Sequence, residues 1–478
     1  MNRPISAPLA DAAALALRLD RDAATPLAWQ LARQLGALIL DGRIRAGAQL
    51  PASRSLAADL AVSRATVVEA YDQLVAEGYV QGRRGAGMFA ASRLVRAEPT
   101  PTPEREPAAP VESGPPRAFR LGAVAADVAP FAEFARGLQR AWMRPDARAL
   151  TIEDPFGLAG LRAAIAAHLA QWRGFAPSPA RIVVTAGLAD ALDIVARSAL
   201  PLPASALVED PGHAPLRDGL ARLGVKVVPV AVDDEGFDLA QAPPGEHHAA
   251  FVTPSRQFPL GAALPIARRL ALVDWARRQD ALIVEDDFDS EYRYAGAPLP
   301  ALASLGGDDH VVYVGSFSKV LFSGLRLGFV VLPARFVAPA RTYLTARGPL
   351  ASTLAQPALA EFIASGRYGA HIRRSRRLYA RRLAALVGEA NRLSPWLRFG
   401  PAEAGLHVVA DLAPAFSARI GDREVAAALE AGGVSAAPVS RFYSGPPRRA
   451  GLALGFAGFS EREIAQAARR MAEILARL

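Results

Sequence analysis

Short apolar runs alternate with helical patterns through the middle of this 478-residue chain, and the alternation limits the folds open to it. Strands that alternate with helices form a largely parallel sheet with helices on both faces. We therefore expect an α/β fold with a mostly parallel seven-stranded sheet. The runs of strand length lie at 182–185, 206–209, 225–230, 249–253, 281–285, 311–315 and 328–332.

The pattern changes after about residue 340. Long arginine-rich helical stretches come first, and short apolar runs follow near 406–411 and 451–456. A few short strands among helices are typical of a mixed layer that packs on a larger domain. This part of the chain predicts a small C-terminal α+β subdomain.

Lys319 follows the apolar run at 311–315, in a chain with 53 arginines and only two lysines. A guanidinium stays protonated, whereas an ammonium can lose its proton and attack an aldehyde, so this lysine suggests a Schiff-base nucleophile. Ser316, Ser318 and Arg326 lie close by, and two hydroxyls with an arginine suit a phosphate dianion. Pyridoxal phosphate carries both an aldehyde and a phosphate. An ordinary turn that contains Ser, Ser and Lys is the alternative.

Two further strand ends carry groups that would complete such a site. An acidic triplet centred on Asp286 ends the run at 281–284, and a carboxylate there can pair with a protonated pyridine nitrogen. Gly187 links the run at 182–185 to an apolar helix, and helix N-termini of this kind bind phosphate. Acids at strand ends also cap helices, and many helices begin at glycine, so neither signal decides alone.

The first 92 residues predict a helix-turn-helix followed by a hairpin. Helical patterns cover 25–42, 53–60 and 63–77, with Ser53 as the cap of the second, and short strands bracket a glycine-rich tip with two arginines at 82–87. The third helix would enter the major groove of DNA with its N-terminal end. A protein-interaction module is the alternative. The inward stripe of the third helix is Val67, Ala70, Tyr71 and Leu74.

Composition limits the setting of the chain. No cysteine is present, so disulfides and thiolate metal sites are excluded, and we expect no metal site. The chain lacks a signal-peptide core and any apolar run of about 18 residues, which indicates a soluble, cytoplasmic protein. Net charge is +9, but the first 92 residues hold 10 arginines against 8 acids, only +2, so charge permits a nucleic-acid partner without demanding one.

Two parts of the chain resemble known families. Residues 50–80 (LPASRSLAADLAVSRATVVEAYDQLVAEGYV) are similar to the GntR winged-helix domain, a resemblance that covers about 25–91. Asp286, the Ser-x-Ser-Lys run ending at Lys319, and Arg326 resemble the cofactor residues of aspartate-aminotransferase-like, fold-type-I proteins that bind pyridoxal 5'-phosphate. This second resemblance covers about 118–478.

Two further stretches resemble the MocR-type regulators of the GntR superfamily, in which both units are fused. They are 253–259 (TPSRQFP) and 284–294 (VEDDFDSEYRY). The resemblance implies a winged-helix domain at 1–92, a proline-rich linker at 93–117 and an aminotransferase-like domain at 118–478.

The resemblance also assigns residues to the two functions. It implies that Lys319 holds pyridoxal phosphate as an aldimine and that Asp286 pairs with the ring nitrogen. The other implied cofactor residues are Ser316, Ser318, Arg326, Gly187, Leu188, Ala189, His213 and Phe288. The implied DNA-binding residues are Arg54, Ser63, Arg64, Thr66, Arg84 and Gly85.

Several neighbours of the cofactor depart from the family pattern. Phe288 stands where relatives often have a tyrosine that donates to the ring hydroxyl, and His213 stands where the stacking aromatic is commonly tyrosine. A histidine can titrate near neutral pH. Ile152 replaces a tyrosine that reaches the neighbouring subunit's phosphate, and Leu188-Ala189-Asp190 replaces a glutamine.

The largest departure is Ala453, which occupies the position of the arginine that binds a substrate carboxylate in aminotransferases of this fold. No arginine lies between 450 and 461, although Arg441, Arg448 or Arg449 can substitute from a loop. We therefore expect a regulator that binds DNA as a homodimer on repeated half-sites and senses pyridoxal phosphate or an amine. An aminotransferase with an accessory DNA-binding domain is the alternative, and a degenerate dimerisation scaffold is a third.

Overall fold

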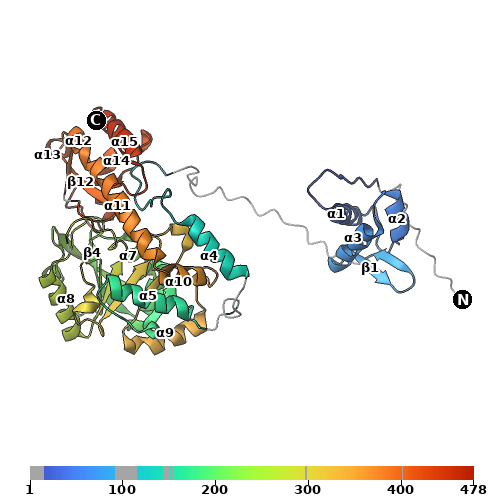
Figure 1. Ribbon diagram of the computed structural model, residues 1–478, viewed down its shortest axis with the longest axis horizontal. Coiled ribbons are helices and arrows are strands. Elements are labelled where there is room, and N and C mark those ends of the chain that lie inside the picture. The colour runs from blue at the N-terminus through green and yellow to red at the C-terminus, as the bar shows by residue number, and fades with distance from the viewer. Residues whose placement is uncertain (1–15, 92–115, 144–150, 152–153, 297–298, 401) are drawn as a thin grey trace. The chain divides into compact units, whose positions relative to one another are not determined.

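The computed structural model of the chain describes residues 16–91, 116–143, 151, 154–296, 299–400 and 402–478 (Figure 1). The chain forms two compact units, Met1–Glu112 and Ser113–Leu478. The linker expected at 93–117 lies outside the described residues except for its last two.

The first unit is a winged helix. Its inward stripe on the third helix is buried as predicted, and Tyr71 in that stripe donates a hydrogen bond to the Pro51 carbonyl at 2.8 Å. Leucines at 31, 35, 56 and 74 fill the core around it. The elements are α1 (Leu27–Leu40), α2 (Ser53–Asp59), α3 (Arg64–Ala76) and the antiparallel hairpin β1 (Val80–Arg83) and β2 (Gly87–Ala90).

The caps of α2 and α3 differ. The Ser63 hydroxyl accepts a hydrogen bond from the Thr66 amide at 3.1 Å and so caps α3. The prediction that Ser53 caps α2 is wrong, because Ser53 is the first helical residue and Ala52 holds the N-cap position. The Ser53 hydroxyl instead accepts a hydrogen bond from Arg64 Nε at 3.4 Å, which joins the two helices.

The second unit is built on an eight-stranded sheet in the order β3-β10-β9-β8-β7-β4-β5-β6. The mostly parallel arrangement is confirmed, because only β10 and the two-residue β6 run antiparallel to their neighbours. Strand β6 is the addition to the predicted seven. The strands are β3 (Ile182–Thr185), β4 (Ala204–Asp210), β5 (Val225–Asp233), β6 (Gly236–Phe237), β7 (Ala249–Val252), β8 (Leu282–Asp287), β9 (Val311–Ser316) and β10 (Gly328–Val331).

Helices cover both faces of this sheet. Alternate residues of each strand point to opposite faces, so Val183 packs with one helix layer and Ile182 with the other. One layer contains α6 (Leu188–Ala199), α7 (Ala214–Arg222) and α9 (Ala334–Arg347). The other contains α5 (Ala159–Trp172), α8 (Ile266–Gln279), α10 (Gln356–Ala364) and α11 (Arg367–Gly388), with α4 (Phe131–Met143) packed on α10.

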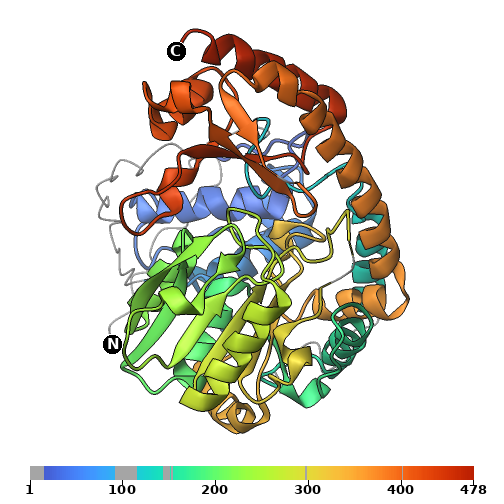
Figure 2. The same ribbon diagram turned by 90° about the vertical axis from the view of Figure 1, so that its left-hand side faces the viewer.

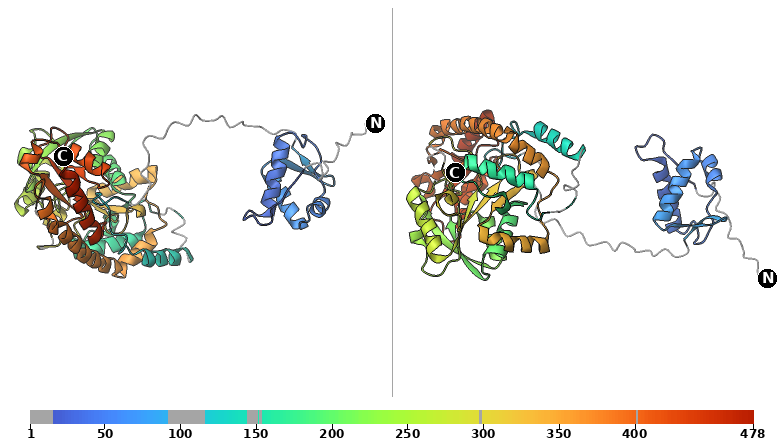
Figure 3. Two further views of the ribbon diagram at one scale, coloured as in Figure 1. Left: turned by 90° about the horizontal axis from the view of Figure 1, so that it is seen from above. Right: turned by 60° about the horizontal axis from the view of Figure 1, so that its bottom comes forward.

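A smaller antiparallel sheet, in the order β11-β12-β14-β13, forms the C-terminal subdomain. Helix α11 leads into it and lies beside α15 (Figures 2 and 3). Because α9 and α10 pack on helices of the large sheet, we place the start of the subdomain within α11 rather than near residue 340. Its elements are β11 (Leu397–Phe399), β12 (His407–Leu412), β13 (Ala437–Pro438), β14 (Gly451–Gly455), α12 (Ala390–Leu393), α13 (Pro414–Ser417), α14 (Asp422–Ala431) and α15 (Glu461–Leu475).

Short 3₁₀ turns connect several of these elements, at Pro179–Arg181, Leu239–Gln241, Leu302–Leu305, Ser323–Leu325 and Val439–Phe442. Within the described ranges, no helix is both long enough and apolar enough to cross a membrane.

The first residues of the second unit add to the small sheet. Phe119 forms a β-bridge with Gly455, whose amide donates to the Phe119 carbonyl at 2.9 Å. The Phe119 side chain is fully buried. A Cβ at Gly455 would lie 2.3 Å from the Arg120 carbonyl oxygen, so glycine permits the close approach. This contact positions the residues that follow, including Gly122.

Replacing Gly455 by alanine should lower the thermal midpoint of the second unit, because the new methyl group meets the backbone of residue 120. Overpacking of this kind costs about 1–3 kcal/mol. Calorimetry of the full chain would measure it. Gly160→Ala in α5 is the matched control, since a Cβ there meets nothing within 4 Å. Equal midpoints for the two variants would contradict the close contact.

Candidate functional site

Three strand ends lie side by side at one edge of the large sheet. Gly328, the first residue of β10, lies opposite Thr185 of β3 on one side and Ser316 of β9 on the other. A Cβ at Gly328 would lie 2.8 Å from the Gly315 carbonyl oxygen, so only glycine fits there. This register brings together the segments that follow Thr185, follow Ser316 and precede Gly328.

These segments carry most of the residues expected to bind phosphate. Gly187 (φ +110) is the N-cap of α6, and the amides of Leu188 and Ala189 in its first turn have no intrahelical acceptor. The Arg326 guanidinium lies next to this turn, since a Cβ at Gly187 would be 3.5 Å from its Nη2. It has no ion-pair partner among the described residues. A free guanidinium beside a helix N-terminus suits an anion.

The Arg326 backbone is held in the left-handed region at φ +50, which non-glycine residues seldom adopt. The Ser316 hydroxyl accepts a hydrogen bond from the Ser318 amide at 3.2 Å, which leaves its own proton for another acceptor. This hydrogen bond orders the turn around Ser316 and does not use the hydroxyl proton of Ser316.

The Lys319 amine lies at the same edge of the sheet. The backbone of Gly122 (φ +77) passes close to it, because a Cβ there would be 3.0 Å from Nζ. Burial lowers the pKa of the Lys319 amine below its ordinary value, and the Asp289 and Asp286 carboxylates oppose this shift. A lower pKa leaves more of the amine unprotonated, which is the form that attacks an aldehyde.

The alternation of β8 separates the acidic triplet. Asp286 points to the same face as Leu282 and Val284, whereas Glu285 and Asp287 point to the other. Burial raises the pKa of Asp286 to about 7, with nearby carboxylates adding to the shift and Lys319 opposing it. A cationic partner such as a pyridinium would stabilise the Asp286 carboxylate.

Glu285 and Asp287 belong to a buried network on the opposite face. Arg173 lies 2.8 Å from Asp287 and 3.6 Å from Glu285, and the Tyr313 hydroxyl donates to Asp287. Arg173 also donates to the Ser255 hydroxyl at 2.7 Å. This network pairs the buried charges with one another, so we assign these acids to structure.

His213 lies at the N-cap of α7, with its ring edge-on to Phe258 at 5.6 Å. Phe288 contacts the same ring at 6.0 Å and has no polar group to donate. Burial lowers the pKa of His213 to about 4, and the charges of Lys319 and Arg217 add to the shift, so the imidazole is neutral near pH 7. Its Nδ1 is buried without a hydrogen-bond partner in the described part of the chain. Titration near neutral pH is therefore not expected.

Ala453 is fully buried in β14, between Val409 of β12 and Ala437 of β13. With Val439 and Phe442 these residues form an apolar cluster, hereafter the apolar wall. Its partly buried margin consists of Leu121, Phe258, Leu260 and Tyr443.

The three arginines considered as substitutes for Ala453 lie elsewhere. Arg449 binds Asp411, with Nη2 2.8 Å from Oδ2. The Arg441 guanidinium lies over the Phe442 ring at 5.1 Å, and Arg448 is exposed. Ile152, the other departure from the family, lies outside the described residues.

Of the residues expected to contact DNA, Arg64, Arg84 and Gly85 line one hollow of the winged helix. Arg54, Ser63 and Arg64 are exposed and Thr66 is half-buried, while Arg84 and Gly85 form the exposed tip of the hairpin. A hollow of about 580 Å³ separates α3 from the hairpin, and Arg64, Arg83 and Arg84 line it. Arginines on both sides of a hollow suit a phosphate backbone.

Four functional candidates were missed by sequence reasoning. Arg83 lies over the Phe89 ring at 4.5 Å and lines the hollow beside Arg84. Gly122 lies next to Lys319 only because the tertiary fold brings the two residues together. No local sequence pattern indicates this contact. Glu209 is a buried carboxylate that accepts hydrogen bonds from the amide (3.0 Å) and hydroxyl (2.6 Å) of Thr253. The position of Glu209 directly before Asp-Pro-Gly-His was a usable signal.

Asp289 and Arg256 form the fourth candidate, a buried ion pair at 3.2 Å. Both lie in the stretches that carried the family resemblance, Arg256 in 253–259 and Asp289 in 284–294, but neither residue was assigned a role there.

The site fits pyridoxal phosphate in three respects. An amine of lowered pKa can hold an aldehyde, a buried carboxylate can hold a protonated ring nitrogen, and an unpaired arginine beside a helix N-terminus can hold a phosphate. Lys319, Asp286 and Arg326 provide these groups at one sheet edge. The unpartnered Nδ1 of His213 also marks this region as built for a further polar group.

Two family models match the chain. Residues 27–89 match "Bacterial regulatory proteins, gntR family", and residues 119–471 match "Aminotransferase class I and II". The two matches correspond to the two compact units. The chain thus combines a DNA-binding regulator domain with an aminotransferase domain.

Relatives with the same combination cover nearly the whole chain. The probable rhizopine catabolism regulatory protein MocR of Rhizobium meliloti is 37% identical over 469 residues, which is 93% of each chain. The pyridoxine biosynthesis transcriptional regulator PdxR of Corynebacterium glutamicum is 35% identical over 453 residues, 94% of this chain and 95% of that one. The chain therefore belongs to the MocR-type regulators of the GntR family, and it is a DNA-binding transcriptional regulator.

Solved aminotransferases share the fold. An archaeal alanine:glyoxylate aminotransferase matches 76% of this chain and 92% of its own, with a TM-score of 0.69 and 22% identity. LysN, the α-aminoadipate aminotransferase of Thermus thermophilus, matches 75% and 92%, with a TM-score of 0.66 and 24% identity. The cofactor that the aminotransferase domain implies is pyridoxal phosphate.

Replacing Lys319 by alanine should abolish borohydride-stable attachment of pyridoxal phosphate to the protein, because Lys319 is the only lysine at the site among the described residues. The only other lysine is Lys226. Peptide mass mapping after reduction would measure the attachment. Lys226→Ala is the matched control and should keep full labelling. Labelling that persists in Lys319→Ala would show that the assignment is wrong.

Proposed function

We propose that the second unit of this regulator holds pyridoxal phosphate at Lys319 and reports a small ligand to the winged helix. The ligand is either the cofactor itself or an amine without an α-carboxylate. The apolar wall around Ala453 carries this proposal, because it occupies the place where a transaminase would bind a substrate carboxylate. When bound, pyridoxal phosphate supplies an aldehyde that exchanges amines and a ring that withdraws electrons.

The residues of the chain bind and orient this group. Arg326, Ser316, Ser318 and the first amides of α6 would hold the phosphate of the cofactor. Asp286 would pair with a protonated ring nitrogen, since a buried carboxylate of raised pKa gains most from a cationic partner.

The Lys319 amine loses its proton readily because its pKa is lowered. Phe288 offers no hydrogen bond to the ring hydroxyl. Neutral His213 provides an aromatic face and no charge.

The same geometry disfavours catalytic transamination. A carboxylate that loses its charged partner gives up about 2–4 kcal/mol, taken as a hydrogen bond to a charged group plus desolvation. That corresponds to a loss of roughly thirtyfold to a thousandfold in binding. The regulator reading therefore fits the site better than the enzyme alternative.

We also propose that the regulator acts as a homodimer in the cytoplasm, where transcription occurs. Large apolar side chains are exposed on α4 and on the segment that leads into α10: Phe131 (51%), Trp142 (47%), Met143 (76%), Leu350 (61%) and Leu354 (49%). Exposed apolar groups gathered on packed elements mark interfaces, and α4 packs on α10. A second copy of the chain would bury them. Occupancy at Lys319 would then favour one arrangement of the two winged helices.

Incubating the holoprotein with each of the twenty amino acids and 2-oxoglutarate should give no steady turnover, because the wall lacks a carboxylate partner. Titrating pyridoxal phosphate or simple amines should change the DNA affinity of the wild type and not of Lys319→Ala. Chromatography of keto acids and fluorescence anisotropy would measure the two effects. Turnover of any common amino acid at ordinary enzyme rates would support the alternative that the protein is an aminotransferase. A DNA affinity that neither pyridoxal phosphate nor amines change would contradict the proposed ligand sensing.

Arg64→Ala should make the free energy of DNA binding less favourable by about 1–3 kcal/mol and relax the preference at one base position, since arginine commonly donates hydrogen bonds to guanine. Arg84→Ala should weaken every sequence alike and lower the salt slope by about one. Anisotropy on DNA with one or two half-sites would measure both. Uniform losses for Arg64→Ala would show that it only positions the helix, and equal affinity for one and two half-sites would contradict the dimer.

A further inference from the structure

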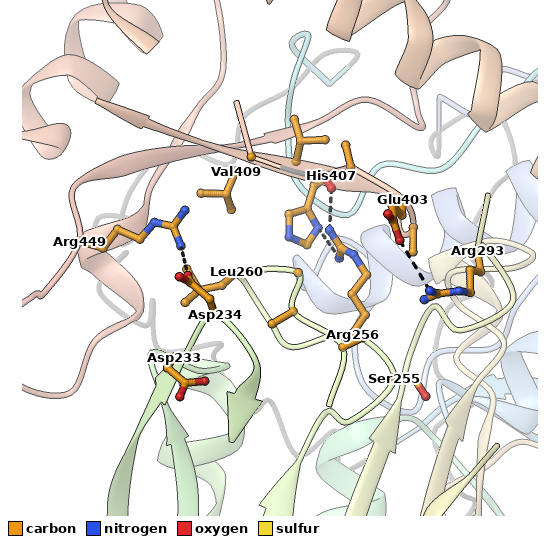
Figure 4. A pocket seen from close by; sticks show the side chains of 17 residues that line it. Asp233, Asp234, Ser255, Arg256, Leu260, Arg293, Glu403, His407, Val409 and Arg449 are labelled. Carbon is orange, nitrogen blue, oxygen red and sulfur yellow. Dashed lines mark hydrogen bonds and ion pairs between the residues drawn. The ribbon is translucent and has the colours of Figure 1, made fainter. Parts of the chain in front are cut away.

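A second cavity of about 480 Å³ lies in the second unit, outside the residues assigned to the cofactor (Figure 4). Its walls are the loop after β7, at 255–263, the segment 400–404 apart from residue 401, the first residues of β12, and Arg449. Neither Lys319 nor Asp286 nor Arg326 lines it. Its volume suits a small metabolite.

Two of the three arginines in this cavity already have hydrogen-bond partners in the protein. Arg256 is buried and donates to the His407 carbonyl at 2.6 Å and to Asp289 at 3.2 Å. Arg449 binds Asp411 through two hydrogen bonds. These two guanidiniums shape the cavity and keep little capacity for a ligand.

Arg293 is different. Its ion-pair partner is Glu403, whose carboxylate is 3.6 Å away and 61% exposed. The Arg293 Nε is buried and has no hydrogen-bond partner among the described residues. The backbone at Gly296 (φ +76) packs against the guanidinium, since a Cβ there would lie 3.0 Å from Nη2, so the group is held in place. A fixed guanidinium whose carboxylate contact is as long as 3.6 Å suits a ligand carboxylate, and Glu403 occupies that role loosely.

The opposite side of the cavity carries acids. Asp233 is bound by Arg268 at 2.7 Å, whereas the Asp234 side chain is fully exposed and lies 3.9 Å from Arg449. The lining holds three arginines and three acids in total. The arginines form the inner surface and the exposed acids form the rim, so the cavity offers both signs of charge to one ligand.

The wall of this cavity is also the wall of the cofactor site. His407 lines the cavity and contacts the Phe258 ring at 5.5 Å, and Phe258 contacts His213 on the other side. Arg256 lines the cavity, and its partner Asp289 acts electrostatically on Lys319. A charged ligand in the cavity therefore acts on the Arg256–Asp289 pair and, through it, on the surroundings of the Lys319 amine.

We propose that this cavity binds a small amino-carboxylic acid, with its carboxylate on Arg293 in place of Glu403 and its ammonium toward the acidic rim, and that binding there alters the affinity of the cofactor site. The regulator would then respond to a zwitterion without any reaction at Lys319. The binding half of this inference does not depend on the proposed function, whereas its effect on the cofactor does.

Trimethylglycine and the trimethylated form of 4-aminobutanoate are suitable probes, because a quaternary ammonium cannot react with an aldehyde. Calorimetry with the holoprotein should show saturable binding of at least one probe, and weaker binding of acetate and of tetramethylammonium. Arg293→Gln should weaken the binding by about tenfold to a hundredfold, as expected for loss of a charged hydrogen bond. Arg278→Gln on the surface of α8 is the matched control and should bind as the wild type does.

Absence of saturable binding of both probes, or equal binding by Arg293→Gln, would overturn the site. The affinity for pyridoxal phosphate should change severalfold when the probe is saturating, and an unchanged affinity would overturn the communication. Borohydride labelling of Lys319 in Arg293→Gln separates this inference from the proposed function, since Arg293 does not reach the cofactor residues. If the cavity does not bind the probes, borohydride labelling of Lys319 should be unchanged.

Discussion

The antiparallel pairing of β10 between β3 and β9 is the constraint on which the cofactor site depends. The three relevant segments are distant in the sequence and meet only because Gly328 lies between Thr185 and Ser316. A shift of one residue in this register would turn the side chains of β10 to the opposite faces of the sheet. The absence of a Cβ at Gly328 allows the strands to close at this point, and Arg326, held two residues earlier at positive φ, then meets the N-terminus of α6.

Sequence patterns predicted the sheet because buried parallel strands are continuous apolar runs, and they predicted the winged helix because its helices have clear periodicity and a serine cap. They could not tell which member of the acidic triplet faces the cofactor without a family resemblance. The alternation of β8 settles which face each acid takes. The local sequence also led to the wrong position for Ser53, which is the first helical residue and not the N-cap. A serine at the start of a helix can take either position.

The apolar wall and the contact of Gly122 with Lys319 could not be predicted from the sequence. Ala453 could be recognised as a departure, but its consequence depends on Val409 and Ala437, which reach it through strand pairing. His213 could be named as a possible titrating group, and only its burial shows that it stays neutral. Burial and long-range pairing are properties of the fold and have no local signature.

The preference for arginine over lysine has a structural explanation in the second unit. Arg269 is 1% exposed and donates to three backbone carbonyls, those of Leu264, Pro300 and Pro254. A guanidinium has five donors in a fixed plane and can satisfy several carbonyls at once, which an ammonium does less well. Arginine therefore suits these buried hydrogen-bonding positions better than lysine, which occurs at only two positions in the chain.

The path of the chain at Phe119 has a mechanical consequence. The first described residues after the linker region pair with the end of β14 in the small sheet and pass close to Lys319. The chain that leads from the winged helix therefore enters the second unit a few residues before Gly122, which lies next to the Lys319 amine. Under the proposed function, a rearrangement around that amine would act directly on the residues at which this connection begins.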